Sequence, residues 1–156
     1  TTHVALVARA FGANKIIVDG EDPKLFETIK KVNKNWGNLS FSVEFTNSPK
    51  DVVRKYKESG YKSVHLTMYG LNIADFFPKK ELNKVLIIVG SEKVERWYYE
   101  NADYNLAVGN QPHSEVSALA LFLDRLFDGM ELKTEFPDAT YKIIPQERGK
   151  KVERIK

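Results

Sequence analysis

Apolar and polar positions along the chain follow two periods, and together they predict a regular succession of strands and helices. Short apolar runs with little alternation are typical of parallel strands that are covered on both faces. We predict strands at residues 15–18, 41–45, 64–69, 85–89 and 106–108. Apolar residues at a spacing of three to four predict amphipathic helices between and around these strands. The helices are expected at residues 1–12, 22–36, 49–60, 72–77 and 114–127.

The alternation of strand and helix predicts an α/β fold, in which a mainly parallel sheet carries helices on both faces. After the last helix, residues 141–144 and 152–155 are expected to form a terminal hairpin or an extended arm around Arg148-Gly149. With 156 residues, the chain has the length of one ordinary domain with a substantial core.

The central stretch at residues 84–123 carries the strongest signal for a binding site. Two of the predicted strands stop at a glycine, Gly90 and Gly109, and small or polar residues follow each of them. In an open α/β sheet, ligands bind beyond the carboxyl ends of the strands. The helix after the second glycine also presents unpaired backbone N–H groups at its start. We therefore expect the chemistry of this protein in these two loops.

Composition excludes several kinds of chemistry. The sequence has no cysteine and only three histidines, which excludes disulfides and thiolate catalysis and makes a dedicated metal site unexpected. No run is long enough to span a bilayer and no signal peptide opens the sequence, so we expect no membrane partner and a cytoplasmic location. The glycine loops match neither the dinucleotide fingerprint nor the P-loop, and no nucleophile elbow surrounds Ser114.

The positive charge of the chain is concentrated at its C-terminal end. Residues 142–156 contain six basic and two acidic side chains, which gives this segment a charge of +4. The whole chain has a net charge of +3, so the remaining residues carry −1. A basic segment of this kind suits a nucleic-acid partner, although a solvated terminus gives the same pattern.

Features of the first and last helices allow more than one interpretation. Arg9 is the only charged residue of the first helix, where the helix dipole alone would favour a cation near the C-terminal end. The residues His113-Ser114-Glu115 at the start of the last helix are consistent with simple capping. That helix also has a second apolar face at Ala118, Leu121 and Phe122, which predicts burial against a partner chain and favours a homodimer.

Several segments taken together point to one protein family more specifically than any one of them does. The chain closely resembles the archaeal SPOUT-class tRNA (cytidine(56)-2'-O)-methyltransferases in TTHVALVARAFGA, VGSEKV, ADYNLAVGNQPHSEVSALALFLDRL and IIPQERGKKV. The resemblance implies a SPOUT-type α/β fold with a C-terminal deep trefoil knot, S-adenosylmethionine bound in the knot loops, tRNA as substrate and an active site at a dimer interface. It implies a methyltransferase domain at residues 1–130, with the knot at about 84–128, and a basic C-terminal extension at 131–156.

The resemblance also implies which residues contact the cofactor. They are Leu66; Gly90, Ser91, Glu92, Lys93 and Val94; and Val108, Gly109, Asn110, Gln111, Pro112, His113, Ser114 and Glu115. Glycines let the backbone approach a ligand, and exposed amides and carbonyls can read the adenine edge. Members of the family begin with a strand and a basic loop before the segment that opens this sequence, and His3 stands where many relatives have asparagine.

Arg9 matches an arginine in the first motif of related ribose methyltransferases, and the resemblance implies a catalytic role for it. Because the pKa of arginine is above about 12, we expect Arg9 to bind the target phosphate and polarise the hydroxyl, while His113 or Glu115 assists with the proton. A non-catalytic RNA- or nucleotide-binding α/β domain and a small-molecule enzyme of flavodoxin-like layout remain as alternatives.

Overall fold

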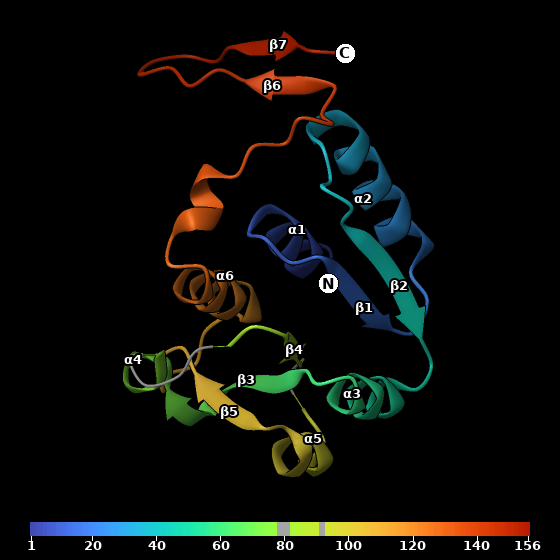
Figure 1. Cartoon of the computed structure of the whole chain (residues 1–156), viewed down its shortest axis with the longest axis vertical. Coiled ribbons are helices and arrows are strands. Elements are labelled where there is room, and N and C mark those ends of the chain that lie inside the picture. Colours follow the sequence, from blue (N-terminus) through green and yellow to red (C-terminus); the bar gives the residue numbers. More distant parts are fainter. Residues whose placement is uncertain (78–81, 91–92) are drawn as a thin grey trace.

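The structure is a computed structural model of the chain, and it describes residues 1–77, 82–90 and 93–156. Strands and helices alternate along the chain, which confirms the predicted α/β class (Figure 1). The helices are α1 (Thr2–Ala10), α2 (Pro23–Trp36), α3 (Pro49–Glu58), α4 (Ile73–Phe76), α5 (Arg96–Asn101) and α6 (Glu115–Leu126), followed by a 3₁₀ helix at Met130–Lys133. The strands are β1 (Lys15–Asp19), β2 (Ser42–Thr46), β3 (Lys62–Asn72), β4 (Val85–Val89), β5 (Tyr104–Ala107), β6 (Tyr141–Ile143) and β7 (Val152–Arg154).

The parallel strands form two sheets rather than the single sheet that the sequence predicts. β1 pairs with β2, and β3 pairs with β4 on one side and with β5 on the other. Neighbouring strands bond only when they lie about 4.8 Å apart, and in the described residues no such pairing joins the two sheets. Instead, α1 packs against α6, which also contacts β3 (Figure 1). Helix packing therefore holds the two halves of the molecule together.

The larger sheet carries helices on both faces, as predicted. Successive residues of a strand point to opposite faces. Val64 and Leu66 of β3 belong to the core that includes α6, whereas His65 lies between them in sequence and packs against Tyr99 of α5. The site that this sheet supports is therefore backed by a helix on each side.

The prediction that the second apolar face of α6 packs against a partner chain is wrong for Phe122. Phe122 is fully buried, and the centroid of its ring lies 5.3 Å from that of Phe77. This ring fills the space between α6 and the segment after α4, so it belongs to the core of the single chain. Leu121, the next residue back, is 52% exposed and is what remains of that face.

The predicted terminal hairpin is confirmed, with β6 and β7 paired in antiparallel fashion. It docks at the C-terminal end of α2 (Figure 1). Thr140 Oγ1 donates a hydrogen bond to the carbonyl of Lys34 at 2.9 Å, and the rings of Tyr141 and Trp36 lie 6.1 Å apart. The basic C-terminal segment is thus an ordered part of the fold.

His65 joins β3 to β5 through a buried polar contact. It is 1% exposed, and its Nδ1 lies 2.9 Å from Oδ1 of Asn105. The side-chain nitrogen of Asn105 donates to the carbonyl of Tyr99 at 2.8 Å, so its oxygen faces His65 and accepts from Nδ1–H. The other ring nitrogen, Nε2, is buried without a hydrogen-bond partner in the described chain. Burial disfavours the charged form of the ring and so lowers the pKa of His65.

We expect His65 to make the folded state less stable in acid. Burial lowers its pKa in the folded chain, whereas a histidine in the unfolded chain titrates near about 6.5. As the pH falls from about 6.5 towards the folded pKa, the unfolded chain binds a proton that the folded chain does not, so the free energy of unfolding decreases. Urea unfolding should show a flatter pH dependence for His65→Gln in this window. His3→Gln, at an exposed position, should keep the wild-type slope, and equal slopes for all three proteins would contradict the assignment.

Candidate functional site

The two glycine loops predicted as the binding site leave the larger sheet at the same edge. Leu66 of β3 lies opposite Val89 of β4 and opposite Leu106 of β5. All three strands are parallel, so the chain continues from β4 to Gly90 and from β5 to Gly109 on either side of β3. This is the carboxyl edge at which open α/β sheets bind ligands.

Beyond this point β3 continues and approaches β5 closely. Its register with β5 shifts partway along, which marks a bulge. A Cβ atom on Gly70 would collide with the main chain of Asn105, so glycine is required there. Asn110 Nδ2 donates to the carbonyl of Met68 at 2.8 Å and to that of Gly70 at 2.9 Å. The Asn110 side chain therefore ties the loop after β5 to the end of β3.

The other end of this loop is fastened to α6. Ser114 caps the helix by accepting a hydrogen bond from the Ser117 N–H, which confirms the capping interpretation for this residue. His113 Nε2 lies 2.7 Å from the carbonyl of Val108. Its Nδ1 lies 2.9 Å from Ser117 Oγ and 3.0 Å from the carbonyl of Ser114. Both ring nitrogens of His113 are thus engaged in shaping the loop.

The backbone of the second loop is open to a ligand that approaches closely. Gly109 has a φ of +75°, and apart from its two neighbours in the chain no described residue has a heavy atom within 4 Å of the position that a Cβ would take. At Gly90, by contrast, the side chain of Val94 already fills the place of a Cβ. Because residues 110–115 are exposed, their main-chain groups are accessible beside the open space over Gly109. This arrangement fits a polar ligand that contacts the main chain.

The predicted contact residues differ in exposure. Leu66 is buried, and Val94, Val108 and Gly109 are half-buried. The exposed members are Lys93, Asn110, Gln111, Pro112, His113, Ser114 and Glu115. The predicted residues Ser91 and Glu92 lie outside the described residues.

Arg9 has its hydrogen-bond partners away from these loops. Its Nε donates to Oδ1 of Asn33 at 2.9 Å, and its Nη2 donates to the carbonyl of Gly37. The centroid of the Phe136 ring lies 5.2 Å from the guanidinium carbon. Arg9 is 9% exposed; burial lowers its pKa, and the charge of Asp138 opposes this shift.

A pocket of about 310 Å³ lies at Arg9 and includes residues that the sequence did not single out. Phe136 and Glu131 line it together with Arg9. Glu131 is 6% exposed, and burial, together with the neighbouring Asp124, raises its pKa. Both residues lie in a segment without periodicity, where the sequence gives no signal of burial.

Two kinds of feature are absent from the part of the chain that the structure describes. Among residues 1–77, 82–90 and 93–156, no helix has the length and apolar character needed to cross a membrane. In the same residues, no group of three or more histidine, aspartate or glutamate side chains is placed to hold a metal ion.

Solved structures define the class of fold. The TrmH/SpoU tRNA modifying enzyme of A. aeolicus matches with a TM-score of 0.62 at 16% identity, over 85% of this chain and 69% of that chain. The SpoU methyltransferase AviRb from Streptomyces viridochromogenes, solved in complex with AdoMet, matches with a TM-score of 0.60 at 18% identity, over 81% of this chain and 51% of that chain. The chain therefore has the fold of the SpoU/TrmH, or SPOUT, methyltransferases.

Sequence similarity narrows this class to one family. Residues 36–153 match the family described as tRNA ribose 2'-O-methyltransferase, aTrm56. The tRNA (cytidine(56)-2'-O)-methyltransferase of Sulfurisphaera tokodaii is 60% identical over 99% of this chain and 92% of its own length. Its counterpart from Saccharolobus solfataricus is 57% identical over 99% of this chain and 98% of its own length. The chain belongs to the aTrm56 family of tRNA ribose 2'-O-methyltransferases.

We expect the Asn110→Ala substitution to loosen the loop at residues 108–114. It removes two hydrogen bonds to main-chain carbonyls, which corresponds to about 1–2 kcal/mol of local opening free energy and about tenfold faster amide exchange. Hydrogen-exchange mass spectrometry over this loop measures the change. Gln111→Ala is the matched control, because Gln111 is exposed and adjacent. Unchanged protection in Asn110→Ala would show that its side chain does not hold the loop.

Proposed function

We propose that this protein transfers the methyl group of S-adenosylmethionine to the ribose 2'-hydroxyl of cytidine 56 in the T loop of tRNA. The observation that carries the proposal is the pair of glycine loops at the carboxyl ends of β4 and β5, in a chain that belongs to a tRNA ribose methyltransferase family. Eight relatives between 47% and 60% identical are named for this activity.

The residues of the two loops fit the cofactor. S-adenosylmethionine supplies a methyl group already activated by a positively charged sulfur. The open space over Gly109 leaves room against the main chain, and the exposed groups of residues 110–115 provide polar contacts. Leu66 is the apolar residue of the proposed site, and Gly90, Lys93 and Val94 are its described contacts from the loop after β4. The task of the protein is then to hold the ribose hydroxyl in line with the methyl group, and such alignment supplies much of the acceleration.

Arg9 binds and polarises the target in this proposal. A guanidinium has five N–H donors, and Asn33 and Gly37 take up two of those of Arg9. The remaining donors suit a phosphate or a developing alkoxide, where a fixed positive charge favours loss of the proton. The internal bonds of Arg9 keep the side chain in one orientation for this purpose.

Glu115 is the better supported of the two proton acceptors. Both ring nitrogens of His113 are bonded within the loop. The carboxylate of Glu115 is exposed in the first turn of α6, and it has no ion-pair partner among the described residues. His113 then contributes by holding the loop in shape.

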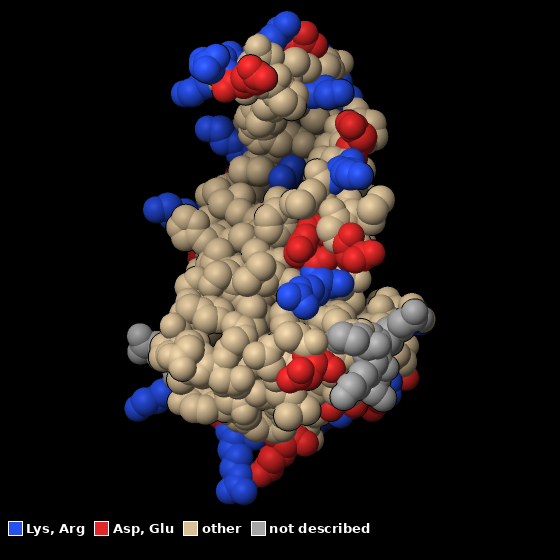
Figure 2. Space-filling view, turned by 90° about the vertical axis from the view of Figure 1, so that its left-hand side faces the viewer, with Lys and Arg blue, Asp and Glu red and all other residues tan. Residues whose placement is uncertain are grey.

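The active form in this proposal is a homodimer that uses the side of the molecule where α6 lies. Three apolar side chains there, Leu121, Met130 and Leu132, are 52%, 62% and 70% exposed. Figure 2 looks onto this side and shows a broad central area with few charged groups. Exposed apolar side chains on one side of a protein are typical of an interface.

The finer architecture follows the same family. The proposal includes a SPOUT domain at residues 1–130 with a deep trefoil knot within 84–128, and a C-terminal extension at 131–156. The strand order β4-β3-β5 and the likeness to SpoU/TrmH enzymes support the knotted domain, and the docked hairpin supports a distinct extension. A tRNA substrate is consistent with a cytoplasmic location.

Methyl transfer to an unmodified tRNA transcript tests the proposal. With labelled cofactor, the label should map to the 2'-oxygen of cytidine 56, and Arg9→Lys should keep cofactor affinity while losing about 100-fold or more in rate, because lysine lacks the fork of donors. Calorimetry with S-adenosylmethionine shows that the variant remains folded. Equal rates would remove Arg9 from the mechanism. Binding of tRNA by the wild type without any transfer would favour the alternative of a non-catalytic RNA-binding domain.

The proposed interface is tested by Leu121→Glu. An unpaired charge in an apolar contact is strongly disfavoured, so this variant should sediment as a monomer and lose methyl transfer. Val152→Glu is the control, because Val152 is also 52% exposed but lies on the hairpin. If Leu121→Glu sediments as a dimer, the interface lies on another surface.

A further inference from the structure

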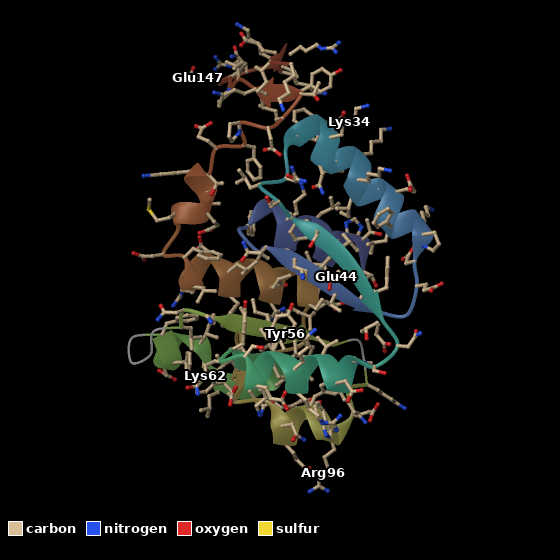
Figure 3. The ribbon with its side chains drawn as sticks, turned by 45° about the vertical axis from the view of Figure 1, so that its right-hand side comes forward. Lys34, Glu44, Tyr56, Lys62, Arg96 and Glu147 are labelled. Carbon is tan, nitrogen blue, oxygen red and sulfur yellow. The ribbon has the colours of Figure 1, made fainter. Side chains whose placement is uncertain are left out.

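A pocket away from the glycine loops lies between α2 and the C-terminal segment. It has a volume of about 560 Å³, which is within the range of ligand pockets. Phe26, Lys30 and Lys34 line one wall at four-residue intervals, so they form one stripe along α2. Lys156 and Asp138 line the pocket from the C-terminal side. Figure 3 shows Lys34 at the end of α2 that lies beside the hairpin.

The pocket has an excess of positive charge. Lys30 and Lys34 are exposed and have no ion-pair partner among the residues that the structure describes. Lys156 Nζ donates to the carbonyl of Asp138 at 3.1 Å. Among the described residues of the lining, only Asp138 carries a side-chain carboxylate. Its Oδ2 accepts from the N–H of Asn38 at 2.9 Å, which lowers the pKa of Asp138, and its Oδ1 is buried without a hydrogen-bond partner in the described chain. Three ammonium groups therefore face one carboxylate that is already hydrogen-bonded.

Three other oxygen atoms of the pocket are used within the protein. Oδ1 of Asn33 accepts from Arg9, and Oδ1 of Asn38 accepts from the N–H of Ser40. Thr140 Oγ1 donates to a main-chain carbonyl. These oxygen atoms are engaged within the protein. The pocket offers a ligand positive charge and the ring of Phe26, which is 42% exposed.

We propose that this pocket binds a single-stranded segment of RNA. Lys30, Lys34 and Lys156 hold the phosphates, and Phe26 stacks on one unpaired base. Binding of this kind tolerates any sequence, because phosphate contacts position the strand and every base has a face to stack on. The inference deepens the proposed function and rests on it, since it assigns a second contact for tRNA, in the half of the molecule that holds the smaller sheet. This contact gives the C-terminal extension a role in binding the substrate.

Fluorescence anisotropy with a labelled single-stranded oligouridylate of about eight nucleotides tests the pocket directly. Replacing Lys30 and Lys34 together by alanine should weaken binding about tenfold or more and reduce the slope of log K against log salt by about 1.4. The matched control is the double substitution of Lys24 and Lys31 by alanine, which removes the same charge from the same helix outside the pocket. It should weaken binding far less.

Phe26→Leu separates stacking from charge. It should weaken oligouridylate binding about fivefold or more and leave the salt slope unchanged, because it removes a ring and no charge. Wild-type affinity in Phe26→Leu, together with full displacement of the oligonucleotide by millimolar inorganic phosphate, would reveal a simple anion site and overturn the proposal. Equal losses in the two lysine pairs would overturn it as well.

The experiments distinguish a failure of the methyl-transfer proposal from a failure of the pocket proposal. If the wild type does not methylate tRNA, the methyl-transfer proposal fails, while the difference between the two lysine pairs in oligouridylate binding still decides the pocket. If the wild type does methylate tRNA, the Lys30/Lys34 double variant should raise the KM for tRNA and leave the affinity for S-adenosylmethionine unchanged. An unchanged KM would overturn the assignment of the pocket to the substrate.

Discussion

The buried guanidinium of Arg9 holds together three parts of the chain that lie far apart in sequence. A charge this far from solvent is tolerated only when its donors are satisfied. Asn33 and Gly37 supply acceptors from α2 and from the turn after it, and Phe136 of the C-terminal segment covers the group. Asp138 then binds the next main-chain N–H of the same turn. The position of the C-terminal extension therefore depends on a residue of the first helix.

The functional groups of the molecule lie in two halves, and Arg9 belongs to one of them. The glycine loops belong to the larger sheet, where Asn110 and His113 fix their shape. Arg9 and the lysine-lined pocket belong to the half with the smaller sheet. The contact between α1 and α6 joins the two halves. A long substrate such as tRNA suits this arrangement, since both halves can contact it at the same time.

The sequence predicts the elements and the glycine loops well, because the periods of apolar residues and the ends of buried strands are local signals. It fails where burial depends on distant partners. The apolar pattern cannot tell whether Phe122 meets a second chain or Phe77 of its own chain. It likewise gives no sign that, in the described residues, no pairing joins the β1-β2 sheet to the β4-β3-β5 sheet, or that His65 contacts Asn105, 40 residues further along the chain. These contacts are set by the three-dimensional packing of segments whose own patterns look ordinary.

The ring contact between Trp36 and Tyr141 gives the protein an internal optical reporter. The chain has two tryptophans, and the structure puts them in different halves: Trp36 at the docked hairpin and Trp97 on α5, where the guanidinium carbon of Arg54 lies 5.1 Å from its ring. With Trp97 replaced by phenylalanine, the emission spectrum follows the surroundings of Trp36 alone. Detachment of the C-terminal extension from α2 would then be visible as a change in fluorescence, without any attached dye.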